Sequence, residues 1–96
     1  MAAYVIGAIQ NVNDPAAFAE YQKLAGPTLD KYGGKGIAGG TKIEVADGSW
    51  SPMGVVVVEF ESLERAKEWY YGPEYNPLVS RRTASTTSSL IFIDGD

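Results

Sequence analysis

Residues Met53–Phe60, MGVVVVEF, place four consecutive valines near the middle of a 96-residue chain. β-Branched residues are enriched in strands, so this stretch predicts a β-strand. Because neighbouring side chains in a strand point to opposite faces, two of the four valines lie on each face of the sheet. A strand with one face in water would alternate apolar and polar residues instead. The stretch therefore predicts a sheet with two apolar faces.

Helix signals lie on both sides of this strand. Before it, Asp14 can accept a hydrogen bond from an unpaired amide, and Pro15 suits the first helical position. Apolar side chains then recur at steps of three and four until the glycines at 33–34, which suit a helix end. After the strand, Ser62 caps a second helix that ends at residues 72–73, Gly-Pro. Each helix is expected to pack its apolar side on the sheet.

The rest of the chain completes a recognisable order of elements. It predicts a first strand over residues 3–12 and a second strand core at Lys42–Val45, with an entry as early as Ile37. Toward the end of the chain it predicts a short helix over Asn76–Ala84. The polar connection Thr83–Ser89 then leads into a last strand at Leu90–Ile93. Strand, helix, strand, strand, helix, strand is the split βαβ order. We therefore predict an α+β, ferredoxin-like fold (βαββαβ) with an antiparallel four-stranded sheet. The length fits a single domain over residues 1–96.

The second apolar face of this sheet needs a cover that two helices cannot supply. The last strand, LIFI over Leu90–Ile93, is apolar on both faces as well. A second copy related by a two-fold axis is the most economical cover, because most soluble oligomers are symmetric homo-oligomers. We predict a homodimer whose two sheets form a shared, barrel-like core. Trp50, in the loop before the valine strand, is expected at a sheet edge or the dimer seam, with a lid over a ligand as the second interpretation.

Charge and composition exclude several classes of partner. The net charge is −4 and Arg81–Arg82 is the only adjacent basic pair, whereas nucleic-acid binders carry a basic face. We therefore expect neither a nucleic-acid partner nor an anionic membrane. The longest aliphatic run, Val55–Val58, is too short to span a bilayer, and the first residues lack the basic region of a signal peptide. The absence of cysteine fits a cytoplasmic protein.

Cofactor and metal sites lack their usual ligands in this chain. It contains no histidine and no cysteine, and its acidic residues show no EF-hand-like spacing. The hydroxyls of Thr83–Ser89 have no histidine base to activate a nucleophile. GKGIAG, Gly34–Gly39, matches G-x-G-x-x-G, but a helix precedes it and a strand follows, the reverse of a dinucleotide-binding motif. We expect no metal and no cofactor.

The whole chain resembles the family catalogued as domain of unknown function 1330, within the dimeric α+β barrel group. The residues that carry this resemblance are Phe18, Tyr21, Tyr32-Gly33-Gly34, Trp50, Glu59-Phe60, Ala66, Trp69, Tyr70, Pro73-Glu74-Tyr75 and Arg82. The resemblance implies a ferredoxin-like fold and a homodimer, and it implies no established biochemical activity. At Gly36 and Gly39 the chain departs from the family pattern, which more often has a bulky residue and an arginine there.

An aromatic-rich stretch, EWYYGPEYNPL over Glu68–Leu78, suggests one wall of a pocket. Tyr21 lies on the inward stripe of the first helix, and Trp69 on the sheet-facing side of the second. Tyr75 and Arg82 are separated by about two helical turns, which places both on one side. The sequence predicts that these four residues line a cleft between the helices and the sheet. An arginine there can hold the carboxylate or enolate of a small organic acid through two parallel hydrogen bonds.

Glu59, at the end of the valine strand, is the candidate acid or base of this cleft. In the alternative interpretation, Arg82 pairs with Glu59 or Glu74 and holds the short helix in place, while the aromatic rings fill the core. Function accordingly divides between two classes. One is a small-molecule pocket, for binding or for cofactor-independent chemistry; the other is a structural or regulatory dimerisation module without a ligand. The sequence leaves open whether the protein is an enzyme.

Overall fold

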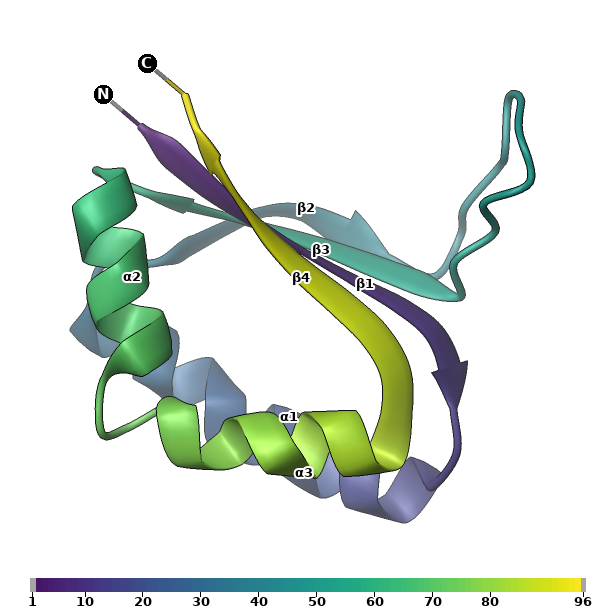
Figure 1. Ribbon diagram of the computed structural model, residues 1–96, viewed down its shortest axis with the longest axis horizontal. Helices are drawn as coiled ribbons and strands as arrows, with labels where there is room; N and C mark the ends of the chain where they lie inside the picture. Colours follow the sequence, from purple (N-terminus) through teal and green to yellow (C-terminus); the bar gives the residue numbers. More distant parts are fainter. Residues whose placement is uncertain (1, 96) are drawn as a thin grey trace.

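A four-stranded antiparallel sheet, covered on one face by helices, forms the computed structural model, which describes residues 2–95 (Figure 1). In chain order its elements are β1 (Ala3–Val12), α1 (Pro15–Lys31), β2 (Lys35–Gly40), β3 (Gly54–Phe60), α2 (Leu63–Tyr71), the 3₁₀ helix η1 (Asn76–Leu78), α3 (Val79–Ser85) and β4 (Thr86–Asp94). The predicted βαββαβ order, with a short additional helix before the last strand, is confirmed. None of the helices among the described residues is long and apolar enough to cross a membrane.

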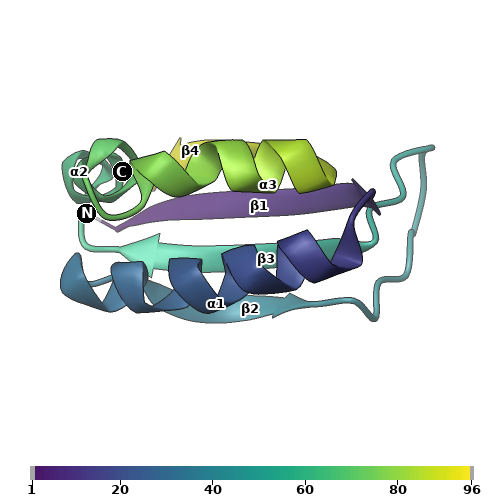
Figure 2. The same cartoon turned by 90° about the horizontal axis from the view of Figure 1, so that it is seen from below.

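The strand order β2-β3-β1-β4 places the first and third strands at the centre of the sheet. Val5 of β1 lies opposite Val58 of β3 and Phe92 of β4. Seen from the helical side, α1 extends along the part of the sheet that holds β2 and β3, and α3 along the part that holds β1 and β4 (Figure 2). All helices therefore lie on one side of the sheet, and the space between them and the sheet contains the core.

The predicted helix boundaries are confirmed by their capping contacts. The Asp14 carboxylate accepts a hydrogen bond of 3.1 Å from the backbone N–H of Ala17 at the start of α1. Gly33, just beyond the end of α1, has φ 76°, a conformation that glycine adopts without steric cost. The Ser62 hydroxyl accepts a hydrogen bond of 3.1 Å from the Arg65 backbone N–H and caps α2.

The position predicted for the second strand is wrong. β2 is the glycine-rich segment Lys35–Gly40, and Lys42–Val45 lies in the exposed loop that follows it. Gly40 pairs with Val55 at the start of β3, so the ladder ends before the loop begins. Hydrogen bonding to the neighbouring strand outweighs the low strand propensity of glycine here. Ile37, the predicted early entry, lies within β2 at an irregularity of the ladder between Gly36 and Ala38.

The polar run Thr83–Ser89 is also more regular than predicted. Its first residues complete α3, and Thr86–Ser89 form the first half of β4. Thr86 pairs with Val12, and Ser89 with Ala8, across the β1–β4 ladder. The strand continues through these polar residues because its backbone groups pair with β1, whichever side chains it carries.

The two apolar faces of the sheet have different environments. On the helical face, Val58 and Phe60 are buried against Trp69 and Tyr75. On the outer face, Val57, Ile6 and Ile91 are register partners in one row. Ile91 of this row is 51% exposed, and Ile93 on the same strand is 41% exposed. The single chain therefore leaves an apolar sheet face uncovered.

The loop between β2 and β3 adds further exposed apolar side chains. It extends from one end of the sheet, away from the helical layer (Figure 1). Its large hydrophobic residues Ile43, Val45, Trp50 and Met53 are all exposed, Trp50 by 58%. Within the single chain, Trp50 therefore does not cover the sheet.

Candidate functional site

A cavity of about 510 Å³ lies between the helical layer and the sheet. Its walls come from β1, β3, the end of β2 and the inward side of α1, and are mainly apolar side chains and glycines. Four predicted site residues line this one cavity: Tyr21, Trp69, Tyr75 and Arg82. The structure thus brings together residues that are spread over three helical segments and the turn that precedes η1.

Two phenols form the centre of the polar end of this cavity. The hydroxyl oxygens of Tyr21 and Tyr75 are 2.7 Å apart, and either can donate to the other. Tyr75 is fully buried, and its ring stacks on Trp69 with the ring centroids 4.1 Å apart. Burial, and then the neighbouring Tyr75, raise the pKa of the Tyr21 phenol above its ordinary value. The Tyr21 phenol therefore keeps its proton at neutral pH. Because only one hydroxyl hydrogen lies between the two oxygens, the pair has a second hydrogen that it can donate to a ligand.

Arg82 brings the positive charge of the cavity. Only 7% of the residue is exposed, and its Nη1 donates a 2.9 Å hydrogen bond to the hydroxyl of Ser88. Its Nε is buried without a hydrogen-bond partner. Within residues 2–95, no carboxylate lies within ion-pair distance of the guanidinium. A buried charge without a counterion is costly, so this geometry favours an anion from outside the chain.

The alternative pairing of Arg82 with Glu59 or Glu74 is wrong. Glu59 pairs in register with Tyr4 of β1 and Lys35 of β2. Its strand neighbour Phe60 is buried in the helical-face core, so Glu59 faces the opposite side of the sheet. This register corrects the expectation that Glu59 lines the cleft.

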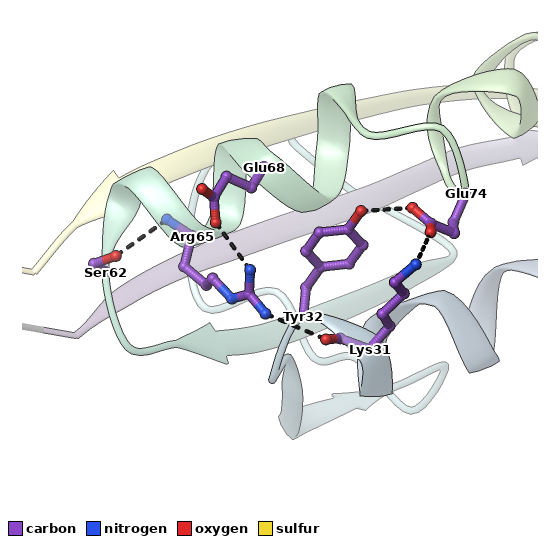
Figure 3. A network of polar contacts seen from close by, with 6 residues as sticks. All are labelled: Lys31, Tyr32, Ser62, Arg65, Glu68 and Glu74. Carbon is purple, nitrogen blue, oxygen red and sulfur yellow. Dashed lines mark hydrogen bonds and ion pairs between the residues drawn. The ribbon is translucent and has the colours of Figure 1, made fainter.

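Glu74 belongs instead to a surface network that holds the segment before Tyr75 against α1 (Figure 3). Its carboxylate accepts hydrogen bonds from the Lys31 ammonium and, at 2.5 Å, from the Tyr32 hydroxyl. These two hydrogen bonds, that of Lys31 first, lower the pKa of Glu74 to about 2. Arg65 lies with its guanidinium carbon 4.9 Å from the centroid of the Tyr32 ring. The network thereby helps to position Tyr75, the next residue in the chain.

Trp69 contributes only the face of its ring to the cavity. Its indole Nε1 donates a 2.9 Å hydrogen bond to the hydroxyl of Thr28, which in turn donates to the Ala25 carbonyl. The indole N–H is therefore not available to a ligand.

Sequence reasoning missed two features of this site. It did not identify Ser88 as the partner of Arg82, because the pattern of Thr83–Ser89 predicts a polar connection and not a strand. It also did not assign any glycine to the cavity wall, although Gly7 and Gly39 both line the cavity. A glycine within an apolar strand is a known sign of close approach, and could have indicated Gly7.

The described residues contain no group of three or more His, Cys, Asp or Glu side chains that could hold a metal ion. The guanidinium and the two phenols of the site can supply charge-assisted hydrogen bonding to an anion and proton donation by a phenol.

Solved structures similar to this chain share its fold. RPA0582, a protein of unknown function from Rhodopseudomonas palustris, is 20% identical, with a TM-score of 0.81 over 99% of this chain and 82% of its own. SnoaB, a cofactor-independent oxygenase from Streptomyces nogalater, is 12% identical, with a TM-score of 0.69 over 99% and 93% of the two chains. A dimeric ferredoxin-like protein of unknown function from Bacteroides fragilis is 11% identical, with a TM-score of 0.67 over 97% and 95%.

These identities establish a shared fold and no shared activity. Among curated proteins, none shows significant sequence similarity to this chain. The family model of a domain of unknown function, in contrast, matches residues 2–96. This match agrees with the ferredoxin-like fold found here, and the chain belongs to the domain of unknown function 1330 (DUF1330) family.

Proposed function

We propose that this protein is a homodimer in which each protomer binds a small organic acid in the cavity between helices and sheet. The observation that carries the proposal is Arg82, a buried guanidinium that lines the cavity and has no carboxylate partner among the described residues. Anion binding would compensate this charge through charge-assisted hydrogen bonds, which are stronger than those between neutral groups.

One nitrogen of the guanidinium remains for a carboxylate. Nη1 donates to Ser88 and Nε is buried, so Nη2 is left to donate a charge-assisted hydrogen bond to an anion. The phenol pair of Tyr21 and Tyr75 has one further hydrogen to donate. The remaining walls are mainly apolar and suit the hydrocarbon part of the acid.

The homodimer is supported by the uncovered outer face of the sheet. Exposed Ile91 and Ile93 there, and exposed Trp50 on the neighbouring loop, are unusual for a monomer in water. The similar protein from Bacteroides fragilis is described as dimeric with the same type of fold. A second copy that packs sheet against sheet would cover this face.

Cofactor-independent acid–base chemistry in the same pocket is the second candidate. It is favoured by the hydrogen-bonded phenol pair, which can donate a proton to an enolate that Arg82 holds. SnoaB, similar in fold, is described as a cofactor-independent oxygenase. A dimerisation module without a ligand is less well supported, because such a module needs neither the cavity nor a buried, uncompensated arginine.

Calorimetric titration with 2-naphthoate and with the uncharged 2-naphthamide tests the acid pocket. We expect the wild-type protein to bind the acid and not the amide, because only the acid compensates Arg82. Arg82→Met should abolish binding, whereas Arg81→Met, a matched change at an exposed neighbour, should preserve it. If Arg82→Met lowers the melting temperature while no acid shifts it in either protein, Arg82 is structural and the proposal is wrong.

A further inference from the structure

The cavity extends across the strands of the sheet. One row of register partners on the helical face lines it from edge to edge: Leu90 of β4, Gly7 of β1, Val56 of β3 and Gly39 of β2. Strands lie about 4.8 Å apart, so a row over four strands is about 14 Å long. We call these four residues the floor row.

The two ends of the cavity differ in chemistry and exposure. At the β4 side, Arg82 is bonded to Ser88, and both Arg82 and Tyr75 are buried. At the β2 side, the lining residues Gly39 and Thr41 are exposed. The charged end is therefore the more enclosed end, whereas the cavity is accessible at the β2 edge and at Val56 of β3, which is 48% exposed.

The floor row has a glycine on either side of Val56, and neither glycine adds a side chain to the cavity floor. Gly7 lies inside the central strand β1, where glycine weakens a strand and provides no side chain to pack. A Cβ atom at Gly7 would lie 3.3 Å from Cγ1 of Val56, and one at Gly39 would lie 3.0 Å from the Val55 carbonyl oxygen. The stacked aromatic rings of Phe18 and Tyr21 on α1 also line the cavity and can pack against the rings of a ligand.

From this geometry we infer that the ligand is an elongated aromatic monocarboxylate with at least two fused rings. Its carboxylate binds Arg82 at the charged end, and its rings lie along the floor row toward the β2 edge. The inference rests on the proposed acid pocket and adds the class of acid. Arg82 is the only charged residue among the described residues that line the cavity, so the cavity itself pairs with one charged group of the ligand.

Affinities for a ligand series test the shape of the pocket. We expect binding to tighten from benzoate to 2-naphthoate to anthracene-2-carboxylate, by about tenfold per added ring. Naphthalene-2,6-dicarboxylate should bind no more tightly than 2-naphthoate, because the cavity has no second charged side chain to pair with its second carboxylate. Decanoate, a flexible acid, should bind more weakly than anthracene-2-carboxylate. Equal affinity for benzoate and the larger acids, or tighter binding of decanoate or the dicarboxylate, would overturn the inference.

A substitution in the floor row tests where the rings lie. Val56→Phe should weaken anthracene-2-carboxylate by about tenfold or more and leave benzoate nearly unchanged, because benzoate occupies only the charged end. Val56→Ala, at the same position, should retain both acids. If Val56→Phe does not fold, Gly54→Leu narrows the opening from β3, where a Cβ atom meets only ordinary contacts. If either filled variant binds the large acid with wild-type affinity, the inferred ring position is wrong.

These outcomes separate the inference from the proposed function. Failure of every acid to bind the wild-type protein overturns both. Binding of all acids through Arg82 without a preference for size overturns only the ligand class.

Discussion

The Tyr21 and Tyr75 hydroxyls form a hydrogen bond of 2.7 Å between residues that are 54 positions apart in the sequence. This contact joins the middle of α1 to the turn that precedes η1, next to the buried guanidinium of Arg82. It fixes the polar end of the cavity from two sides.

Tyr21→Phe should weaken both the fold and the binding of acids. Without its hydroxyl, buried Tyr75 loses its hydrogen-bond partner, which costs about 1–3 kcal/mol of unfolding free energy. Urea denaturation measures this loss, and titration with 2-naphthoate measures the affinity. Tyr71→Phe, at a residue that is 67% exposed, is the control and should change neither quantity. Wild-type values for Tyr21→Phe would show that the phenol pair does not contribute.

Arg82→Met should leave the unfolding free energy of the ligand-free protein within about 1 kcal/mol of wild type, although it abolishes acid binding. The variant loses one hydrogen bond to Ser88 but also removes a buried charge that has no counterion. Urea denaturation without any added acid measures the difference. A loss of several kcal/mol would contradict this account, because it would mean that Arg82 mainly stabilises the fold.

Acid should destabilise the protein partly through Glu74. The folded-state pKa of Glu74 is lowered from 4.5 to about 2, so its contribution to stability is complete above pH 4.5 and is lost as the pH falls toward 2. Glu74→Gln should therefore flatten the decrease of unfolding free energy between pH 5 and pH 2. Glu68→Gln, in the exposed pair with Arg65, controls for the loss of any carboxylate. An unchanged pH dependence in Glu74→Gln would show that the hydrogen bonds from Lys31 and Tyr32 do not stabilise the fold.

Val57→Asp should prevent dimerisation and yield a monomeric, aggregated or unfolded chain. Val57 lies on the outer sheet face in register with Ile6, and burying one such side chain is worth about 1.5–3 kcal/mol. Sedimentation velocity at micromolar concentration compares this variant with the wild-type protein, which we expect to sediment as a dimer. Ser80→Asp, on the exposed side of α3, should remain dimeric. A wild-type protein that sediments as a monomer would contradict the predicted assembly.

The sequence predicted the helices better than the strands, for physical reasons. Side-chain caps such as Asp14 and Ser62 act within a few residues, so they can be read locally. β2 depends on backbone hydrogen bonds to β3, which the composition of Lys35–Gly40 does not reveal. The apolar residues Ile43 and Val45 gave a stronger strand signal in a segment that is loop.

The candidate site was predicted in part for a related reason. Helical periodicity predicted that Tyr21 and Trp69 lie on the inward faces of their helices. It also predicted that Tyr75 and Arg82 lie on one side of the short helical segment. The structure brings all four residues to one cavity. The prediction that Glu59 lines the cleft failed because both faces of β3 are apolar. The alternation along the strand separates Glu59 from Phe60, but it does not tell which of the two faces the helices cover.

A crystal structure of the protein with 2-naphthoate tests the central claim most directly. We predict that the carboxylate accepts a hydrogen bond from Nη2 of Arg82, and that the rings lie over Gly7 and Val56 toward the β2 edge. A structure in which side chains fill the cavity, or in which the acid binds only at the surface while Arg82 pairs with a carboxylate of the chain, would contradict the account.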